Sequence, residues 1–171
     1  AVTEANQGQL VTLGIQPSRP DTGYGYIEVA QGKHAAGSVQ QVHRFCEKPS
    51  LDVAKTFVEE GNYFWNSGIF IWRADVILDA MNLYANTLYH VFCESLASYN
   101  TPMEDGFMRS AFAAAEDISI DFAVMEHATN VSVVISDFDW SDLGTWGSLI
   151  DHMHKDSNGN AVVGNNVHLF E

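Results

Sequence analysis

The chain has 171 residues, of which 46% are hydrophobic and 18% charged, a composition typical of a folded protein rather than a disordered one. Acidic residues outnumber basic residues by 22 to 8, which argues against nucleic acid as a partner because binding a polyanion depends on clustered Lys and Arg. There is no apolar run of roughly 20 residues, no basic and apolar leader and no CxxC pair, so we expect a cytoplasmic protein with no membrane partner.

The first half of the chain predicts four strands and one helix. The strands are short runs rich in β-branched and aromatic residues and bounded by turn residues: 10–15, 24–30, 38–48 and 68–73. The last run, GIFIWR, is apolar at nearly every position, which predicts a strand buried on both faces. Residues 50–61 predict a helix, with Ser50 as its N-cap and Gly61 as its stop.

The second half predicts mainly helices. Apolar residues recur at helical spacing in five segments: 74–84, 87–99, 103–116, 119–128 and 145–153. A strand is predicted at 131–138, a turn at 156–160 and the beginning of a β-rich segment at 161–170. Strands interleaved with helices predict an α/β fold, and its sheet should be mixed because the first strands follow one another closely.

The segment DWSDLGTW, residues 139–146, places carboxylates directly after the predicted strand 131–138. Ligands of open α/β sheets bind at the carboxyl ends of strands, and Mg²⁺ takes one or two carboxylates together with substrate phosphates. Asp142 is therefore a candidate metal ligand. The alternative is that Asp142 only caps the helix that follows, and its position does not separate the two.

The segment RFCEKPS, residues 44–50, places Glu47 and Lys48 immediately before Pro49. A proline disfavours helical backbone at the preceding residue, so we expect Lys48 to be extended and both side chains to project from a fixed backbone. The Glu47 carboxylate can accept hydrogen bonds from two sugar hydroxyls, and Lys48 can contact a phosphate. The alternative is an exposed Glu–Lys pair without a ligand.

Two further motifs carry candidate binding residues. FWNSGIFIW, residues 64–72, sets Asn66 among aromatic residues, where a buried amide needs backbone partners or a sugar hydroxyl. DTGYGYI, residues 21–27, contains Gly23 and Gly25, which permit a close approach of backbone to a ligand. A simple turn also explains Gly23.

Five motifs in this order and spacing resemble those of mannose-1-phosphate guanylyltransferases, the GDP-mannose pyrophosphorylases: GIQPSRPDTGYGYI, FCEKP, WNSGIFIW, SIDFAVME and DWSDLGTW. The resemblance covers residues 10–165 and implies the second half of a Rossmann-like nucleotide-diphospho-sugar transferase fold, a mixed sheet with flanking helices. It implies that residues 1–155 form the sugar-phosphate-binding half of a nucleotidyltransferase domain. Residues 156–171 would begin a following β-rich segment that is cut short.

The resemblance also implies a role for each candidate residue. Asp142 would bind Mg²⁺, and Lys48 would meet the sugar phosphate, so both would take part in catalysis. Gly25 would lie against the sugar, while Glu47 and Asn66 would hold its hydroxyls. Two weaker candidates lie in the same motifs: Arg19 and Asp121. An aspartate at the position of Asp121 is equally explained by a helix N-terminus.

The function implied is the joining of mannose 1-phosphate to GTP, releasing pyrophosphate and GDP-mannose, by a homo-oligomeric enzyme. The family's glycine-rich nucleotide loop, its basic residue for the triphosphate and its first metal aspartate would lie upstream of Ala1, so we expect the chain alone to be inactive. Two alternatives remain: a related pyrophosphorylase with another sugar phosphate or nucleotide, and a non-catalytic sugar-phosphate-binding or assembly module.

Overall fold

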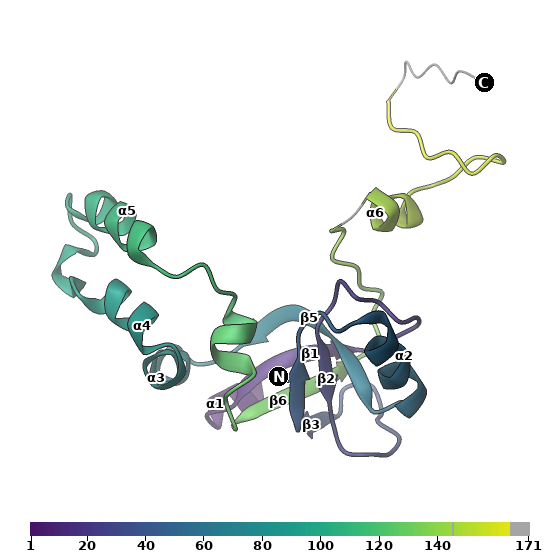
Figure 1. Cartoon of the computed structure of the whole chain (residues 1–171), viewed down its shortest axis with the longest axis horizontal. Coiled ribbons are helices and arrows are strands. Elements are labelled where there is room, and N and C mark those ends of the chain that lie inside the picture. The colour runs from purple at the N-terminus through teal and green to yellow at the C-terminus, as the bar shows by residue number, and fades with distance from the viewer. Residues whose placement is uncertain (145, 165–171) are drawn as a thin grey trace. The chain divides into compact units, whose positions relative to one another are not determined.

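Six short strands form one mixed sheet in the first of two units, Ala1–Phe138 and Asp139–Glu171 (Figure 1). The computed structural model describes residues 1–144 and 146–164, with only the backbone at 151 and 152. The strands are β1 (Leu10–Ile15), β2 (Tyr26–Glu28), β3 (Val39–Gln41), β4 (Arg44–Cys46), β5 (Tyr63–Ile71) and β6 (Val131–Ser136). Their order across the sheet is β3-β6-β1-β5-β2-β4, and β1 and β6 are parallel whereas the other neighbours are antiparallel, which confirms the predicted mixed sheet.

The two edge strands, β3 and β4, lie at opposite ends of this order although only Val42 and His43 separate them in the chain. The Val42 N–H donates to Val131 O of β6 at 3.0 Å, and the His43 N–H donates to Glu28 O of β2 at 2.8 Å. Consecutive residues thus bond to strands near opposite edges of the sheet. The sheet is therefore curled so that its two edges come together. The prediction of one strand over 38–48 was wrong, because this segment crosses between the edges and forms two strands.

The first unit also contains helical segments, some of which pack on the sheet. These segments are α1 (Val2–Asn6), α2 (Leu51–Glu60), α3 (Ala74–Tyr84), α4 (Asn86–Cys93), η1 (Leu96–Ser98, a 3₁₀ turn), α5 (Glu104–Ala114) and η2 (Asp121–Met125, a π-helical turn). Of these, α4 and α5 extend away from the sheet (Figure 1). On one face Phe57 of α2 stacks on Tyr63 of β5, with ring centroids 3.9 Å apart. On the other face Ala80 of α3 and Val124 of η2 join Phe64 in the main hydrophobic core. Tyr63 and Phe64 serve different faces because successive side chains of a strand alternate.

Strand β5 differs most from its prediction. It begins at Tyr63 rather than at Gly68, and its first five residues are buried. The residues that follow are exposed or half-buried, with Ile69 43% exposed, so the expected burial of GIFIWR on both faces was wrong. The cause is a bulge opposite β1: Thr12 pairs with Phe70, but Gly14 pairs with Asn66, so the residues between leave the regular ladder.

The helix boundaries were predicted with mixed success. Helix α3 has the predicted bounds, and Gly61 ends α2 in the left-handed conformation with φ 75°. Ser50 occupies the N-cap position of α2 but makes no capping hydrogen bond through its side chain. The predicted helix 87–99 is too long, because α4 ends at Cys93. No residue of α4 is buried, so tertiary packing adds little to hold a longer helix together.

The second unit contains α6 (Trp146–His152) and a turn that follows it. Asp156 accepts the N–H groups of Asn158 and Asn160 at 2.9 and 2.8 Å, which confirms the predicted turn. An isolated bridge between Lys155 and Ala161 closes it, whereas the rest of the expected β-rich segment, from residue 165, lies outside the described residues. No helix in the described ranges is long and apolar enough to cross a membrane.

Candidate functional site

Asn66 lies where β5 leaves its regular pairing with β1, and the local sequence explains this position. The bulge that follows contains Gly68, whose φ of 71° is a conformation that glycine adopts without strain. This turn brings the Gly68 N–H back onto Asn66 Oδ1 at 3.3 Å. The bulge therefore lets the backbone hold the amide side chain of its own strand.

The Asn66 side chain is 8% exposed and has three partners from three segments. Its Oδ1 accepts the Thr12 hydroxyl at 2.9 Å as well as the Gly68 N–H. Its Nδ2 donates to Asp121 Oδ1 at 2.9 Å, which links β5 to the first residue of η2. From the sequence, either backbone groups or a sugar hydroxyl could be the partners of this amide. In the structure its partners are one backbone group, of Gly68, and two side chains, of Thr12 and Asp121.

Gly25 lies between Asn66 and Glu47. Its carbonyl accepts the Asn66 N–H at 2.8 Å. A Cβ at this position would overlap Glu47 Oε2 and lie 3.4 Å from Asn66 Cβ. The structure therefore brings together three of the four residues predicted to bind substrate, and it is the Glu47 carboxylate that closely approaches Gly25.

Glu47 follows the last residue of β4, and its side chain is 12% exposed. The pKa of its carboxyl is raised, first by burial and then by the negative charge of Asp121, while the neighbouring Lys48 lowers it. The Glu47 N–H donates to Glu126 Oε1 at 3.3 Å, so a residue just beyond η2 fixes the end of β4. Two carboxylates from the η2 region thus surround a third one.

The expectation that Lys48 is extended was wrong. Its φ is 44°, in the left-handed region, which costs a non-glycine residue roughly 1–2 kcal/mol. The proline rule disfavours the right-handed helical region, and the turn from β4 into α2 within a few residues selects the left-handed one. The side chain is 64% exposed, and its Nζ lies 3.7 Å from Glu47 Oε1. Strain of this kind concentrates at functional sites.

Arg19 packs on the other side of β5. Its guanidinium carbon lies 5.3 Å from the ring centroid of Trp65, and its Nη2 is 2.8 Å from Asp21 Oδ2. Trp65 precedes Asn66 in a regular part of β5, so the two side chains point to opposite faces. Arg19 and Asn66 are therefore separated by the sheet, whereas Asp121 contacts Asn66 directly.

Asp142 belongs to the second unit and is exposed. Its Oδ1 accepts the Gly144 N–H at 2.9 Å, which makes a tight turn around Leu143, whose φ is 51°. Helix α6 begins at Trp146, so Asp142 stands in this turn, ahead of the helix. A carboxylate held by a backbone N–H has the fixed orientation that metal ligands usually have.

Two residues of the candidate site were not predicted from the sequence, Thr12 and Glu126. Thr12 is fully buried in β1, and its hydroxyl reaches Asn66. The available signal was a single hydroxyl inside the apolar run LVTLGI, since a buried polar group needs a partner. Glu126 lies in the motif SIDFAVME, but no local pattern indicated that it reaches the backbone of β4.

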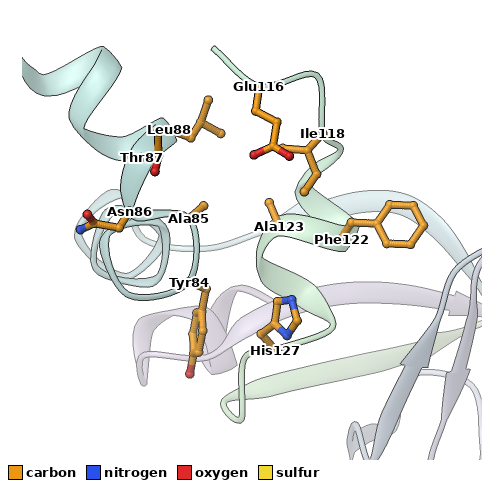
Figure 2. A pocket seen from close by; sticks show the side chains of 10 residues that line it. All are labelled: Tyr84, Ala85, Asn86, Thr87, Leu88, Glu116, Ile118, Phe122, Ala123 and His127. Atoms are coloured by element: carbon orange, nitrogen blue, oxygen red, sulfur yellow. The ribbon is translucent and has the colours of Figure 1, made fainter. Parts of the chain in front are cut away.

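A separate cavity of about 210 Å³ lies beside η2 (Figure 2). Tyr84, Glu116, Phe122 and His127 contribute to its walls, and Tyr84 and His127 stack with ring centroids 6.3 Å apart. None of the residues predicted to bind substrate lines it. Because Asp121 contacts Asn66 while the next residue, Phe122, lines this cavity, η2 contributes to both places.

A curled mixed sheet with a carboxylate and an amide held beside a glycine defines a site suited to a polyhydroxylated ligand. The Nucleotidyl transferase family model matches residues 1–159, and the chain therefore belongs to the nucleotidyl transferase family. It is 41% identical over 168 residues to mannose-1-phosphate guanylyltransferase of Sinorhizobium fredii (strain NBRC 101917 / NGR234), covering 96% of this chain and 32% of that relative. The match to mannose-1-phosphate guanylyltransferase of Escherichia coli is 37% over 174 residues and covers 98% and 37%. The chain thus spans about a third of these curated relatives.

A solved structure shows the same fold. The crystal structure described as mannose-1-phosphate geranyltransferase from Thermus thermophilus superimposes with a TM-score of 0.73 at 31% identity, covering 88% of this chain and 42% of that one. This likeness confirms the predicted Rossmann-like nucleotidyltransferase fold.

Proposed function

We propose that this chain is the sugar-phosphate-binding part of an enzyme that joins mannose 1-phosphate to GTP, forming GDP-mannose and pyrophosphate. The observation that carries the proposal is the cluster around Gly25, where the Glu47 carboxylate and the side chain of Asn66 both lie against the glycine. The names of the relatives from Sinorhizobium fredii and Escherichia coli support mannose 1-phosphate and a guanylyl group as the reacting pair.

Glu47 is the acceptor for sugar hydroxyls in this proposal. An ionised carboxylate accepts hydrogen bonds at both oxygens and can therefore bind two hydroxyl groups at once. Burial and the charge of Asp121 raise the pKa of the Glu47 carboxyl, so its ionisation is less favourable than that of an ordinary glutamate. Hydroxyl donors of a bound sugar would favour the ionised form and oppose this rise in pKa. Asn66 supplies the complementary donor through its Nδ2.

Lys48 binds the phosphate of the sugar phosphate. Its backbone is left-handed, and its exposed ammonium group lies 3.7 Å from Glu47 Oε1. An ammonium is a compact charge that suits a phosphate without demanding one geometry. The substrate would thus span from the carboxylate of Glu47 to the cation of Lys48.

Asp142 holds Mg²⁺ in this proposal. A carboxylate oxygen is the type of ligand that Mg²⁺ prefers, and the Gly144 N–H orients the Asp142 carboxylate. The ion, when bound, would neutralise charge on the phosphates.

The reaction is a substitution at phosphorus. An oxygen of the sugar phosphate forms a bond to the α-phosphorus of GTP as the bond to the pyrophosphate leaving group breaks in line. Such a reaction needs little covalent help from the protein, so the residues of this chain contribute by positioning the attacking phosphate.

The test uses the full-length gene product that carries these residues, purified from a host without its own GDP-mannose pyrophosphorylase. Pyrophosphate release is followed with each pairing of GTP, ATP, UTP or dTTP with mannose 1-phosphate or glucose 1-phosphate. Release that is fastest with GTP and mannose 1-phosphate supports the proposal. Preference for another pair would identify a related pyrophosphorylase. Binding of sugar phosphate without any release would indicate a non-catalytic module.

The residue assignment is tested in the same assay with Glu47→Gln and Asn66→Ala. Losing a hydrogen bond to a buried hydroxyl should raise the KM for mannose 1-phosphate by about 5- to 150-fold. The KM for GTP should stay near that of the wild type. A rise in the KM for GTP alone would show that these residues belong to the nucleotide part of the site rather than to the sugar part.

A further inference from the structure

Thr12 is a hydroxyl residue fully buried in the apolar strand β1. A hydroxyl in such surroundings is costly unless it is hydrogen-bonded. Thr12 Oγ1 lies 2.9 Å from Asn66 Oδ1 and 3.3 Å from Ile69 O. Both neighbours are carbonyl oxygens that can only accept, so the hydroxyl must donate, and the shorter contact is to Asn66.

The orientation of the Asn66 amide follows from its neighbours. The Gly68 N–H can only donate, and it points at Oδ1, while the Asp121 carboxylate accepts from Nδ2 on the other side. A flipped amide would set oxygen against carboxylate and nitrogen against N–H. These bonds leave one Nδ2 hydrogen for a ligand, and the backbone N–H of the same residue donates to the Gly25 carbonyl.

We propose that Thr12 is a positioning residue for sugar selection: its hydroxyl holds the Asn66 amide so that the pocket presents a donor at Asn66 beside the acceptor at Glu47. Thr12 acts through Asn66 and does not contact substrate. The inference rests on the proposed function, because it assigns to that site the pairing of one accepting and one donating sugar hydroxyl.

The first experiment compares Thr12→Val with Thr12→Ser in the full-length gene product. Valine keeps the shape and removes the donor, whereas serine restores it. Thr12→Val should raise the KM for mannose 1-phosphate by about 3- to 10-fold, which corresponds to one hydrogen bond. Its kcat, its KM for GTP and its thermal midpoint should stay near the wild-type values, and Thr12→Ser should recover the KM. If Thr12→Val does not fold, Thr12→Ala removes the donor without placing a methyl group against the amide.

The second experiment locates the effect with deoxy analogues of mannose 1-phosphate. The hydroxyl that contacts Asn66 is the one whose removal raises the KM of the wild type strongly but raises the KM of the Asn66→Ala variant little. Thr12→Val should lose selectivity for that same hydroxyl and keep it for the others. An equal loss for every analogue would overturn the inference.

The outcomes separate the inference from the proposed function. If Asn66→Ala leaves the KM for mannose 1-phosphate unchanged, the assignment of the site fails. If Asn66→Ala raises this KM while neither Thr12→Val nor Thr12→Ala does, only the role of Thr12 is overturned. If Thr12→Val lowers the thermal midpoint and raises the KM for both mannose 1-phosphate and GTP, the role of Thr12 is structural. That result also overturns the inference.

Discussion

Replacing Gly25 with alanine should damage substrate binding while leaving the fold nearly intact. The new Cβ would overlap Glu47 Oε2, whereas its next neighbours, Asn66 Cβ and Phe45 Cε1, would lie at ordinary contact distances of 3.4 and 3.5 Å. The overlapped atom is the far end of a flexible side chain, and the φ of Gly25 is not in the left-handed region. The protein can therefore relieve the overlap by moving the Glu47 carboxylate rather than the backbone.

The magnitude follows from that movement. The carboxylate must shift by about 1 Å, and a misplacement of this size in a positioning group can cost about 100-fold in rate. The kcat/KM for mannose 1-phosphate should therefore fall by about 10- to 100-fold. The free energy of unfolding should change by less than about 1 kcal/mol, because no backbone or cavity change is required.

The assay measures kcat/KM for mannose 1-phosphate, KM for GTP and the unfolding midpoint of the full-length gene product. Gly106→Ala is the matched control, because the same change in α5 places a Cβ with no atom within 4 Å. In a Glu47→Gln background, Gly25→Ala should add little, since both changes act on one carboxylate. The reasoning would be refuted if the kcat/KM of Gly25→Ala stayed within twofold of the wild type. It would also be refuted if Gly25→Ala lowered kcat/KM as much in the Glu47→Gln background as in the wild type.

Three other changes test the remaining groups of the site. Glu47→Gln should raise the unfolding midpoint at neutral pH, and this advantage should disappear below pH 4.5, the ordinary pKa of the carboxyl. Burial and Asp121 raise the pKa of Glu47 in the folded protein, so the wild type loses stability as the pH rises from 4.5 through that raised pKa. An advantage that persists at acid pH would contradict a raised pKa. Asp142→Asn should abolish most turnover at limiting Mg²⁺ with little change in the unfolding midpoint, since the amide keeps the shape but loses the charge. Near-normal turnover would contradict the proposed role of Asp142 as a metal ligand. Lys48→Ala should weaken binding of mannose 1-phosphate but not of mannose in calorimetry, and equal losses for both would place the ammonium away from the phosphate.

Local signals predicted the elements whose ends are set by their own residues. β1 and α3 have the predicted bounds, and Gly61 stops α2 as expected. The failures depend on partners distant in the chain. The two strands made from 38–48 depend on pairing with β6 and β2, and the exposed end of β5 depends on a bulge against β1. No pattern within these segments contains that information.

The candidate site shows the same division. The motifs around Gly25, Glu47 and Asn66 indicated residues suited to a sugar, and the structure brings these three together. Thr12 and Glu126 escaped notice because each acts across many residues, Thr12 on an amide in β5 and Glu126 on the backbone after β4. The backbone at Lys48 was mispredicted because the proline rule excludes one region without choosing among the others.

In the proposed function, the charges of the candidate site would determine the orientation of a bound sugar phosphate. Three carboxylates lie near one another at this site, those of Glu47, Asp121 and Glu126, and the pKa of Glu47 is raised in part by the charge of Asp121. A phosphate placed there would meet like charges, whereas hydroxyl groups would find acceptors. Lys48, with its exposed ammonium 3.7 Å from Glu47, is the cation beside this cluster, and only 8 of the 171 residues are Lys or Arg. In the proposed function, the phosphate of a bound sugar phosphate would therefore point toward Lys48 and out of the carboxylate cluster, which is the orientation that an attack on a nucleotide outside the cluster would require.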